Sequence, residues 1–160
     1  AIDYHDLNID WTIPTDIGFV YDGLGNDIDT TSSYTQLQAN WGASTDPNSD
    51  IADYWYCIGT TPGSSNIVNW TNNGLNTSVT HTGLNLNFNT TYYISVKSRN
   101  NAGLFSNVKT SNGQLAFNIS SVLVANFTAN QTTINAGSSV NFTDLSTNTP
   151  TSWVWIFEGG

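Results

Sequence analysis

The sequence predicts an all-β protein, and three features of its composition indicate this. Asn, Ser and Thr are abundant, 13 of the 160 residues are glycine, and the chain has one glutamate and no methionine. Good helix formers are therefore scarce, whereas aromatic residues make up 12% of the chain. Gly, Pro, Asn and Asp recur roughly every 8–12 residues, which is the spacing of turns between short antiparallel strands. We expect a sandwich of such strands.

The first strands follow from alternating apolar residues. Residues 1–11 alternate Ile, Tyr, Leu and Trp with polar residues and indicate a strand, so residues 1–13 are either an N-terminal strand or the end of an upstream domain. The stretch 18–41 predicts a short strand, an acidic glycine-rich loop, and a strand in which Leu37, Ala39 and Trp41 share a face. Pro14 separates the two stretches.

The pattern continues to residue 114. In the stretch 51–63, Tyr54, Tyr56 and Ile58 share a face, and further strands are expected at 67–70, within 78–86 and within 91–106, before a turn at Gly113. About seven strands are therefore expected between Thr12 and Gln114.

The second half of this region resembles a fibronectin type III domain, an immunoglobulin-like antiparallel β-sandwich. The matching residues are Leu86, Thr90, Tyr92, Val96, Ser98, Asn100, Gly103 and Ser106, with Trp41 at the position of the family's strand-B tryptophan. The resemblance implies that the Tyr92 hydroxyl bonds back to the loop before its strand. Phe88 and Ser98 depart from the family's usual Pro and Ala.

The phrases YDGLGNDID, LQANWGASTDPNS, IGTTPG, VNWTNNG and TYYISV resemble one subgroup of these domains. That subgroup occurs in large secreted and surface proteins of Bacteroidetes. The resemblance implies a fibronectin type III-like domain over 14–116 and an extracellular location.

The tail resembles the first half of a PKD domain, after a linker at 117–123. Its matching residues are Phe127, Gly137, Val140, Phe142, Asp144, Ser146, Trp153, Trp155, Phe157 and the final Glu158-Gly159-Gly160. The resemblance implies a partial second β-sandwich over 124–160, with a strand at 153–157. The strands that complete this domain are expected downstream, in a longer multimodular protein of which this chain is a fragment.

The net charge limits the classes of partner that the chain can bind. Twelve acidic residues against Lys97, Arg99 and Lys109 give a formal net charge of −9. Nucleic acids require clusters of Lys and Arg, and anionic membranes repel an acidic chain. No apolar run reaches membrane-spanning length, so we expect neither nucleic-acid binding nor membrane insertion. A divalent cation or a neutral polysaccharide remains an open partner.

The sequence does not predict a catalytic site. His5 and His81 are the only histidines, and His81 is interpreted as a solvated strand residue. Cys57, the only cysteine, is interpreted as a small half-buried residue. Every aspartate except Asp53 lies beside turn residues or in the N-terminal stretch, where we expect ordinary pKa values. We therefore expect no enzymatic activity.

Calcium is the one cofactor for which the sequence offers candidate ligands. Two acidic loops supply hard oxygen ligands: Asp22, Asn26, Asp27 and Asp29 in the first, and Asp46, Asn48 and Asp50 in the second. Ile51 replaces the glycine of an EF-hand loop, and no glutamate follows at the required distance. The alternative is that these residues form turns, with side chains bonded to local amides.

Two tryptophans and one threonine are the remaining candidates. Trp55 lies on the opposite strand face from Tyr54 and Tyr56, and Trp70 lies near a loop, so either could stack on a sugar ring. Both could equally cover a sheet edge or face a neighbouring domain. The Asp29-Thr30-Thr31 triplet resembles the acceptor of the Bacteroidetes O-glycosylation system, which makes Thr30, in an expected loop, a candidate modification site.

These observations favour a non-catalytic accessory or spacer module of a secreted or cell-surface protein. Its expected partners are neighbouring domains of the same polypeptide, and a polysaccharide or a cell-surface protein. By family analogy the parent protein is a peptidase or a polysaccharide-degrading enzyme. The alternative is a carbohydrate-binding module or a calcium-stabilised adhesion module.

Overall fold

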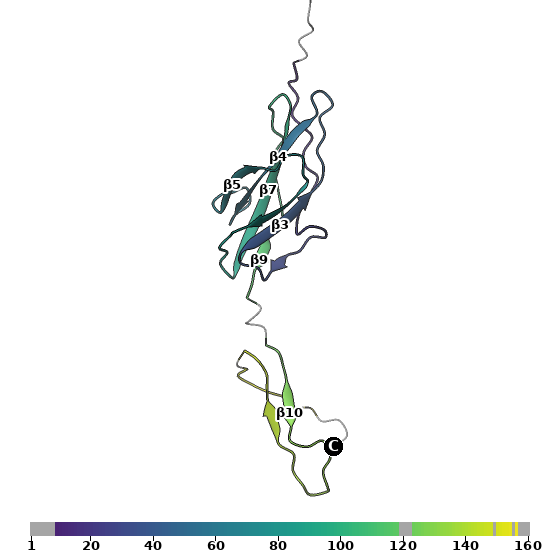
Figure 1. Ribbon diagram of the computed structural model, residues 1–160, viewed down its shortest axis with the longest axis vertical. Coiled ribbons are helices and arrows are strands. Elements are labelled where there is room, and N and C mark those ends of the chain that lie inside the picture. The colour runs from purple at the N-terminus through teal and green to yellow at the C-terminus, as the bar shows by residue number, and fades with distance from the viewer. Residues whose placement is uncertain (1–8, 119–122, 149, 155, 157–160) are drawn as a thin grey trace, which may run out of the picture. The chain divides into compact units, whose positions relative to one another are not determined.

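The computed structural model describes residues 9–118, 123–148, 150–154 and 156 (Figure 1). Every regular element within these residues is a β-strand, which confirms the all-β prediction. In the part of the chain that is described, no helix is long and apolar enough to cross a membrane. The chain divides into two compact units, Ala1–Phe117 and Asn118–Gly160.

The first unit is a sandwich of two sheets. The three-stranded sheet has the order β1-β3-β6, which are Val20–Asp22, Gln36–Trp41 and Ser78–Thr82. The larger sheet has the order β2-β9-β7-β4-β5, which are Thr30–Thr31, Gln114–Ala116, Thr90–Asn100, Ile51–Gly59 and Val68–Asn72. In addition, β8 (Lys109–Thr110) pairs with β7. The described pairs are antiparallel except for β2 with β9, which is parallel.

The hydrophobic core lies between these two sheets, and every second residue of a strand points into it. Leu37, Ala39 and Trp41 of β3 are buried, and so are Tyr54, Tyr56 and Ile58 of β4, as predicted. Strands β1, β7 and β9 add inward-facing residues of their own, and segments outside the strands add two more apolar side chains. These further core residues are Ile17, Val20, Leu86, Tyr92, Ile94, Val96 and Ala116.

Three short strands, β2, β8 and β9, have no counterpart in the predicted set. Each has only two or three residues, which is too few for an alternating pattern to show. Strand β9 pairs with the first residues of β7 on one side and with β2 on the other. Tertiary pairing therefore defines these strands.

The predicted N-terminal strand is wrong for its described part. Residues 9–11 have no strand conformation, and Trp11 is 81% exposed, because no described strand pairs with them. Polar contacts hold this segment instead, since the amide group of Asn100 donates to the Asp10 carboxylate at 2.9 Å and to the Thr12 carbonyl at 3.0 Å. Residues 1–8, including His5, lie outside the described residues.

The second unit contains one described ladder, between β10 (Phe127–Ala129) and β11 (Phe142–Asp144). The strand expected at 153–157 is not formed at Trp153, Val154 or Ile156, and Trp155 and Phe157–Gly160 lie outside the described residues. A strand needs a neighbour for its backbone hydrogen bonds, and no described strand pairs with this segment. Val154 and Ile156 are accordingly 87% and 85% exposed.

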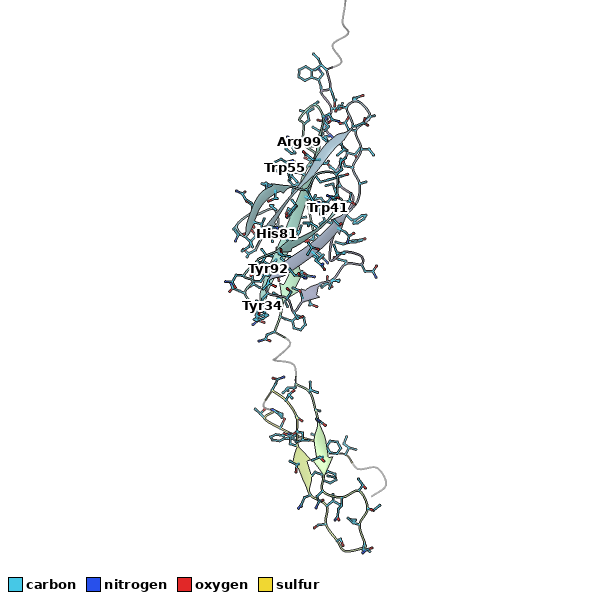
Figure 2. The ribbon with its side chains drawn as sticks, viewed as in Figure 1. Tyr34, Trp41, Trp55, His81, Tyr92 and Arg99 are labelled. Atoms are coloured by element: carbon cyan, nitrogen blue, oxygen red, sulfur yellow. The ribbon has the colours of Figure 1, made fainter. Side chains whose placement is uncertain are left out.

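Tyr92 ties the beginning of β7 to the loop that precedes it. Its ring is buried, and its hydroxyl accepts a hydrogen bond from the Asn87 amide at 2.8 Å. Tyr92 and Arg99 lie toward opposite ends of the same long strand (Figure 2). The bond fixes the backbone where the chain crosses from the smaller sheet to the larger one.

Gly59→Ala should destabilise the first unit by about 2 kcal/mol or more, because it overpacks a closed contact. A Cβ at Gly59 would lie 1.9 Å from the Ser64 hydroxyl and 2.4 Å from the Ser64 carbonyl oxygen. Urea denaturation should show a lower midpoint. Gly18→Ala is the matched control, since a Cβ there meets no atom within 4 Å. Equal stabilities of the two variants would contradict the packing described.

Tyr92→Phe should cost about 1 kcal/mol, the usual net value of one hydrogen bond, because the Asn87 amide loses its acceptor. The neighbouring Tyr93→Phe removes a hydroxyl from a half-buried ring and serves as the control. Both variants are compared with wild type by urea denaturation. An unchanged stability for Tyr92→Phe would show that this bond does not hold the loop.

Candidate functional site

The outer face of β4, β5 and β7 brings aromatic and charged side chains into contact. Because Tyr54 and Tyr56 point into the core, Asp53 and Trp55 point outward. The register places Asp53 opposite Arg99, and Trp55 between Lys97 on β7 and Asn72 on β5. We call this surface the aromatic–cationic face and define it as Asp53, Trp55, Trp70, Asn72, Lys97, Arg99 and Phe105.

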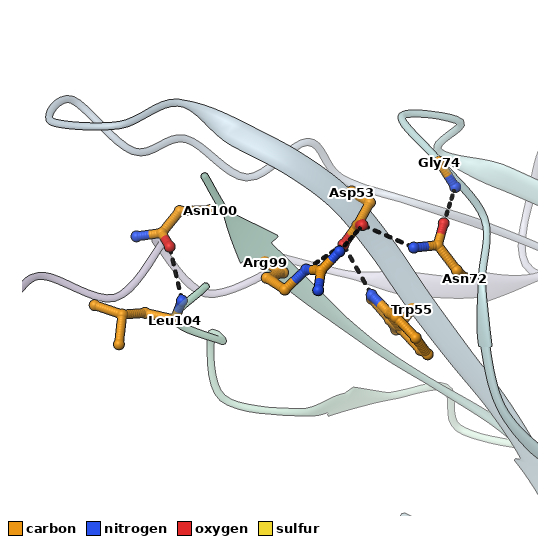
Figure 3. A network of polar contacts seen from close by, with 7 residues as sticks. All are labelled: Asp53, Trp55, Asn72, Gly74, Arg99, Asn100 and Leu104. Atoms are coloured by element: carbon orange, nitrogen blue, oxygen red, sulfur yellow. Dashed lines mark hydrogen bonds and ion pairs between the residues drawn. The ribbon is translucent and has the colours of Figure 1, made fainter. Parts of the chain in front are cut away.

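Asp53 is the hub of this face (Figure 3). One carboxylate oxygen accepts hydrogen bonds from the Trp55 indole at 2.8 Å and from Arg99 Nε at 3.1 Å. The other accepts Asn72 Nδ2 at 2.7 Å and forms an ion pair with Arg99 Nη2. Asn72 in turn accepts the Gly74 amide at 2.7 Å. One carboxylate thus fixes side chains from three neighbouring strands.

These contacts decide the charge of Asp53. Its burial alone would raise the pKa of the carboxyl, but hydrogen bonds from Arg99, Asn72 and Trp55 outweigh burial and lower the pKa below its ordinary value. Asp53 therefore carries a negative charge at neutral pH. That charge neutralises Arg99, which also lies 5.6 Å from the centre of the Trp55 ring.

Lys97 is the second cation of the face, and it lies between two aromatic rings. Its ammonium nitrogen is 4.4 Å from the centre of the Trp70 ring and 4.1 Å from that of Phe105. Phe105 also meets Trp55 edge to face, with ring centres 6.3 Å apart. The ring faces attract the cation and hold it in place.

Trp55 and Trp70, the predicted sugar-stacking residues, therefore lie on one face, and both are half-buried. The sequence did not single out Lys97, Arg99 and Phe105 as part of a site. The pairing of β4 with β7 brings Lys97 and Arg99 to Trp55, and a bridge between Arg99 and Phe105 adds Phe105, so no local motif could reveal the set. The alternation of Lys97 and Arg99 with core residues was the one available indication.

The first predicted calcium loop does not gather its ligands. Asp22 lies in β1 and faces the core, whereas Asp27 accepts the Asp22 backbone amide at 2.9 Å. Asp29 accepts the side-chain amide of Asn112 at 3.0 Å. Asn26 is exposed. Asp27 thus bonds a local amide, as in the alternative interpretation, whereas Asp29 bonds a residue distant in sequence and Asp22 belongs to a strand.

Asp22 corrects the expectation of ordinary carboxyl pKa values. It is 1% exposed, and neither carboxylate oxygen has a well-formed hydrogen bond, although Ser111 and Gly113 face it. Burial is the main reason that its pKa rises to about 7, and the charges of Asp27 and Asp29 add to the effect. Asp22 faces the core because it lies two residues after Val20 in the same strand, and Val20 also faces the core.

The second predicted loop is held by hydrogen bonds as well. Asp46 is buried, and it accepts the backbone amides of Asn48 and Ser49 at 2.9 and 3.0 Å and the Asn100 side-chain amide at 3.0 Å. The Asn100 bond is the chief cause that lowers the pKa of Asp46. Asp50 adopts a left-handed backbone with φ of 58°. Within the described residues, no group of three or more His, Cys, Asp or Glu is arranged to hold a metal ion.

The two residues considered for nucleophilic chemistry have structural contacts. His81 is half-buried rather than solvated, because it faces inward with Val79, and its Nδ1 lies 2.8 Å from the Tyr56 hydroxyl. Cys57 is fully buried rather than half-buried, and burial raises the pKa of its thiol. Its Sγ lies 3.5 Å from the Ser64 carbonyl oxygen, under the loop that follows β4.

Thr30, the candidate glycosylation site, is exposed but does not lie in a loop. It belongs to β2 and pairs with Leu115 of β9. Its side chain therefore stands at a sheet edge, where an attached sugar would project outward.

The second unit has an apolar groove of about 630 Å³, whose lining includes Phe127, Phe142, Trp153, Val154 and Ile156. The rings of Phe127 and Phe142 meet edge to face across the β10–β11 ladder, with centres 6.0 Å apart. This groove is an uncovered sheet face and contains one carboxylate, that of Asp144.

No family model matches the chain, and no curated protein matches it. The resemblance to fibronectin type III and PKD domains therefore stays a prediction.

Asp22→Asn should change how stability depends on pH. Because the folded pKa is about 7 and the ordinary value is 3.8, the folded protein binds more protons than the unfolded chain between these pH values. Wild type therefore loses stability as pH rises from 4 to 7, and the variant should not. At pH 8 the variant should be more stable by up to about 4 kcal/mol.

Urea denaturation from pH 4 to pH 8 measures this difference, and Asp16→Asn, at an exposed carboxylate, is the control. Parallel pH curves for wild type and Asp22→Asn would contradict the burial of a carboxyl at this position.

Proposed function

We propose that the chain is a non-catalytic accessory segment of a secreted or cell-surface multidomain protein, and that its first unit is a fibronectin type III-like spacer. Three features support the first unit's assignment to this family. The sheet β1-β3-β6 and the β9-β7-β4-β5 part of the larger sheet have strand orders expected of an immunoglobulin-like sandwich, with β2 added at the edge. Trp41 lies in the core, and the Tyr92 hydroxyl bonds to the preceding loop.

The spacer proposal is supported mainly by the path of the chain, which enters and leaves the first unit at opposite ends. Residues 10–12 contact Asn100, the last residue of β7. At the other end, Ala116 pairs with Thr90, the first residue of β7, and the Phe117 amide donates to the Thr31 carbonyl. Figure 1 shows the N-terminal segment and β9 at the two ends of this sandwich. The 11 residues of β7 span roughly 35 Å, so the module adds at least that length to the polypeptide.

A spacer must also hold the chain firmly where it enters. The buried Asn100 side chain donates to Asp10, to the Thr12 carbonyl and to Asp46, and it accepts the Leu104 amide at 2.8 Å. Asp10 also accepts the Ser49 hydroxyl at 2.6 Å, and this bond is the largest of those that lower its pKa to about 2. The N-terminal segment is thereby tied to two loops of the sandwich.

The second unit fits the proposal as the beginning of a PKD-like module. Its two-stranded ladder leaves apolar side chains exposed, and two strands alone are marginally stable in water. Further strands that cover Phe127 and Phe142 would complete such a module. The parent protein proposed on this basis is a secreted peptidase or polysaccharide-degrading enzyme, by family analogy.

The spacer function predicts a fixed distance across the first unit. Fluorescent dyes on Ile9→Cys and Phe117→Cys report that distance by energy transfer in single molecules, while the buried Cys57 stays unlabelled. We expect a narrow distribution at roughly 35 Å or more. Asp10→Ala should widen it, because the N-terminal segment loses its acceptor for Asn100 and Ser49. Asp16→Ala should leave it unchanged.

A broad distribution in the wild type, or ends that lie close together, would rule out a rigid spacer. A cooperative urea transition measured on the same labelled protein shows that the dyes have not disturbed the fold.

A further inference from the structure

We propose that the aromatic–cationic face binds an acidic polysaccharide through its uronic acid residues, a role that goes beyond that of a spacer. A pyranose ring has an apolar face of C–H groups that packs on an indole or phenyl ring, and a uronic acid adds a carboxylate at the ring edge. Lys97 supplies the cation, and a sugar ring would pack on the side of the Trp70 or Phe105 ring that Lys97 does not occupy; Phe105 is 37% exposed and Trp70 is half-buried.

The distribution of charge selects an anionic ligand. Two of the three basic residues of the chain, Lys97 and Arg99, lie on this face. Asp53 neutralises Arg99, but among the described residues none forms an ion pair or hydrogen bond with the Lys97 ammonium group. Its N–H groups can therefore donate to a ligand carboxylate, and such charge-assisted hydrogen bonds are stronger than neutral ones.

The overall charge of −9 does not prevent this binding. At physiological ionic strength the screening length is about 8 Å, so distant carboxylates act weakly at this face. The one carboxylate within the face, Asp53, already accepts four hydrogen bonds from its neighbours. Lys97 is therefore the main source of electrostatic potential at this face, and that potential is positive.

The side chains of the face are already held by contacts with one another before any ligand arrives. Asp53 fixes the Trp55 indole, and the rings of Trp70 and Phe105 fix Lys97. A site whose side chains are already ordered loses little conformational entropy on binding. Free lysine side chains on a surface lack this advantage, which distinguishes Lys97 from Lys109, an exposed residue of β8.

The test is a calorimetric titration of the full 160-residue chain with polygalacturonate, in buffer containing EDTA so that calcium cannot bridge the acidic loops to the polymer. Polygalacturonate whose carboxyl groups have been reduced to alcohols is the neutral control, and polyglutamate is the anionic control without sugar rings. We expect binding to polygalacturonate alone, weakening as salt is added.

Matched variants locate the binding. Lys97→Met keeps the aliphatic chain between the rings and removes the charge, so affinity should fall about tenfold or more. Lys109→Met changes the net charge equally and should leave affinity within about twofold. Trp70→Leu should also weaken binding, whereas Trp11→Leu, at an 81% exposed position, should not. Urea denaturation verifies that each variant is folded.

Three results would overturn the proposal. The first is no binding of polygalacturonate by the wild type. The second is equal binding of the reduced polymer or of polyglutamate, which would assign the face to neutral sugars or to acidic peptides. The third is an equal effect of Lys97→Met and Lys109→Met, which would place the polymer elsewhere or show that only net charge matters.

Discussion

The antiparallel pairing of β4 with β7 is the constraint on which the rest of the first unit depends. It is continuous from Tyr93 opposite Gly59 to Arg99 opposite Asp53. Because side chains alternate across a strand, this one register assigns Tyr54, Tyr56, Ile94 and Val96 to the core and the aromatic–cationic face to the outside. A shift of either strand by one residue would turn the core residues of that strand outward. The hydrophobic core therefore fixes the geometry of the outer face.

Carboxylates and amides hold the end of this sandwich at which the last residue of β7 lies. Asp46 binds the amides of its own loop, and Asn100 binds Asp46, Asp10 and the Thr12 carbonyl. An acidic chain that is poor in lysine satisfies its carboxylates in this way, with neutral N–H and O–H donors. Asp22 is the exception, since its carboxyl is buried without well-formed bonds. Its carboxylate destabilises the folded state at any pH at which it is ionised.

The sequence was sufficient for what depends on local periodicity. The core positions of β3 and β4 were predictable because Leu37, Ala39, Tyr54 and Tyr56 repeat every second residue. Of the residues in the aromatic–cationic face, the sequence indicated only the two tryptophans as a candidate site. Lys97 and Phe105 reach Trp70 and Trp55 through pairing between strands distant in sequence, which no local pattern contains. Asp22 was assigned to a loop because its acidic neighbours obscured its alternation with Val20.

Rigidity connects the two proposed roles of the first unit. The pairing that makes β7 a stiff strand across the sandwich also holds Lys97 and Arg99 in register with Trp55. Because β4 is hydrogen-bonded to β7 and, with one irregularity between Tyr56 and Ile58, to β5, a deformation of their outer face would break ladder hydrogen bonds. A sandwich that acts as a rigid spacer would therefore also present a fixed outer face. A ligand bound there would sit at a defined distance along the polypeptide, which is how a spacer can position a neighbouring domain on a polymer.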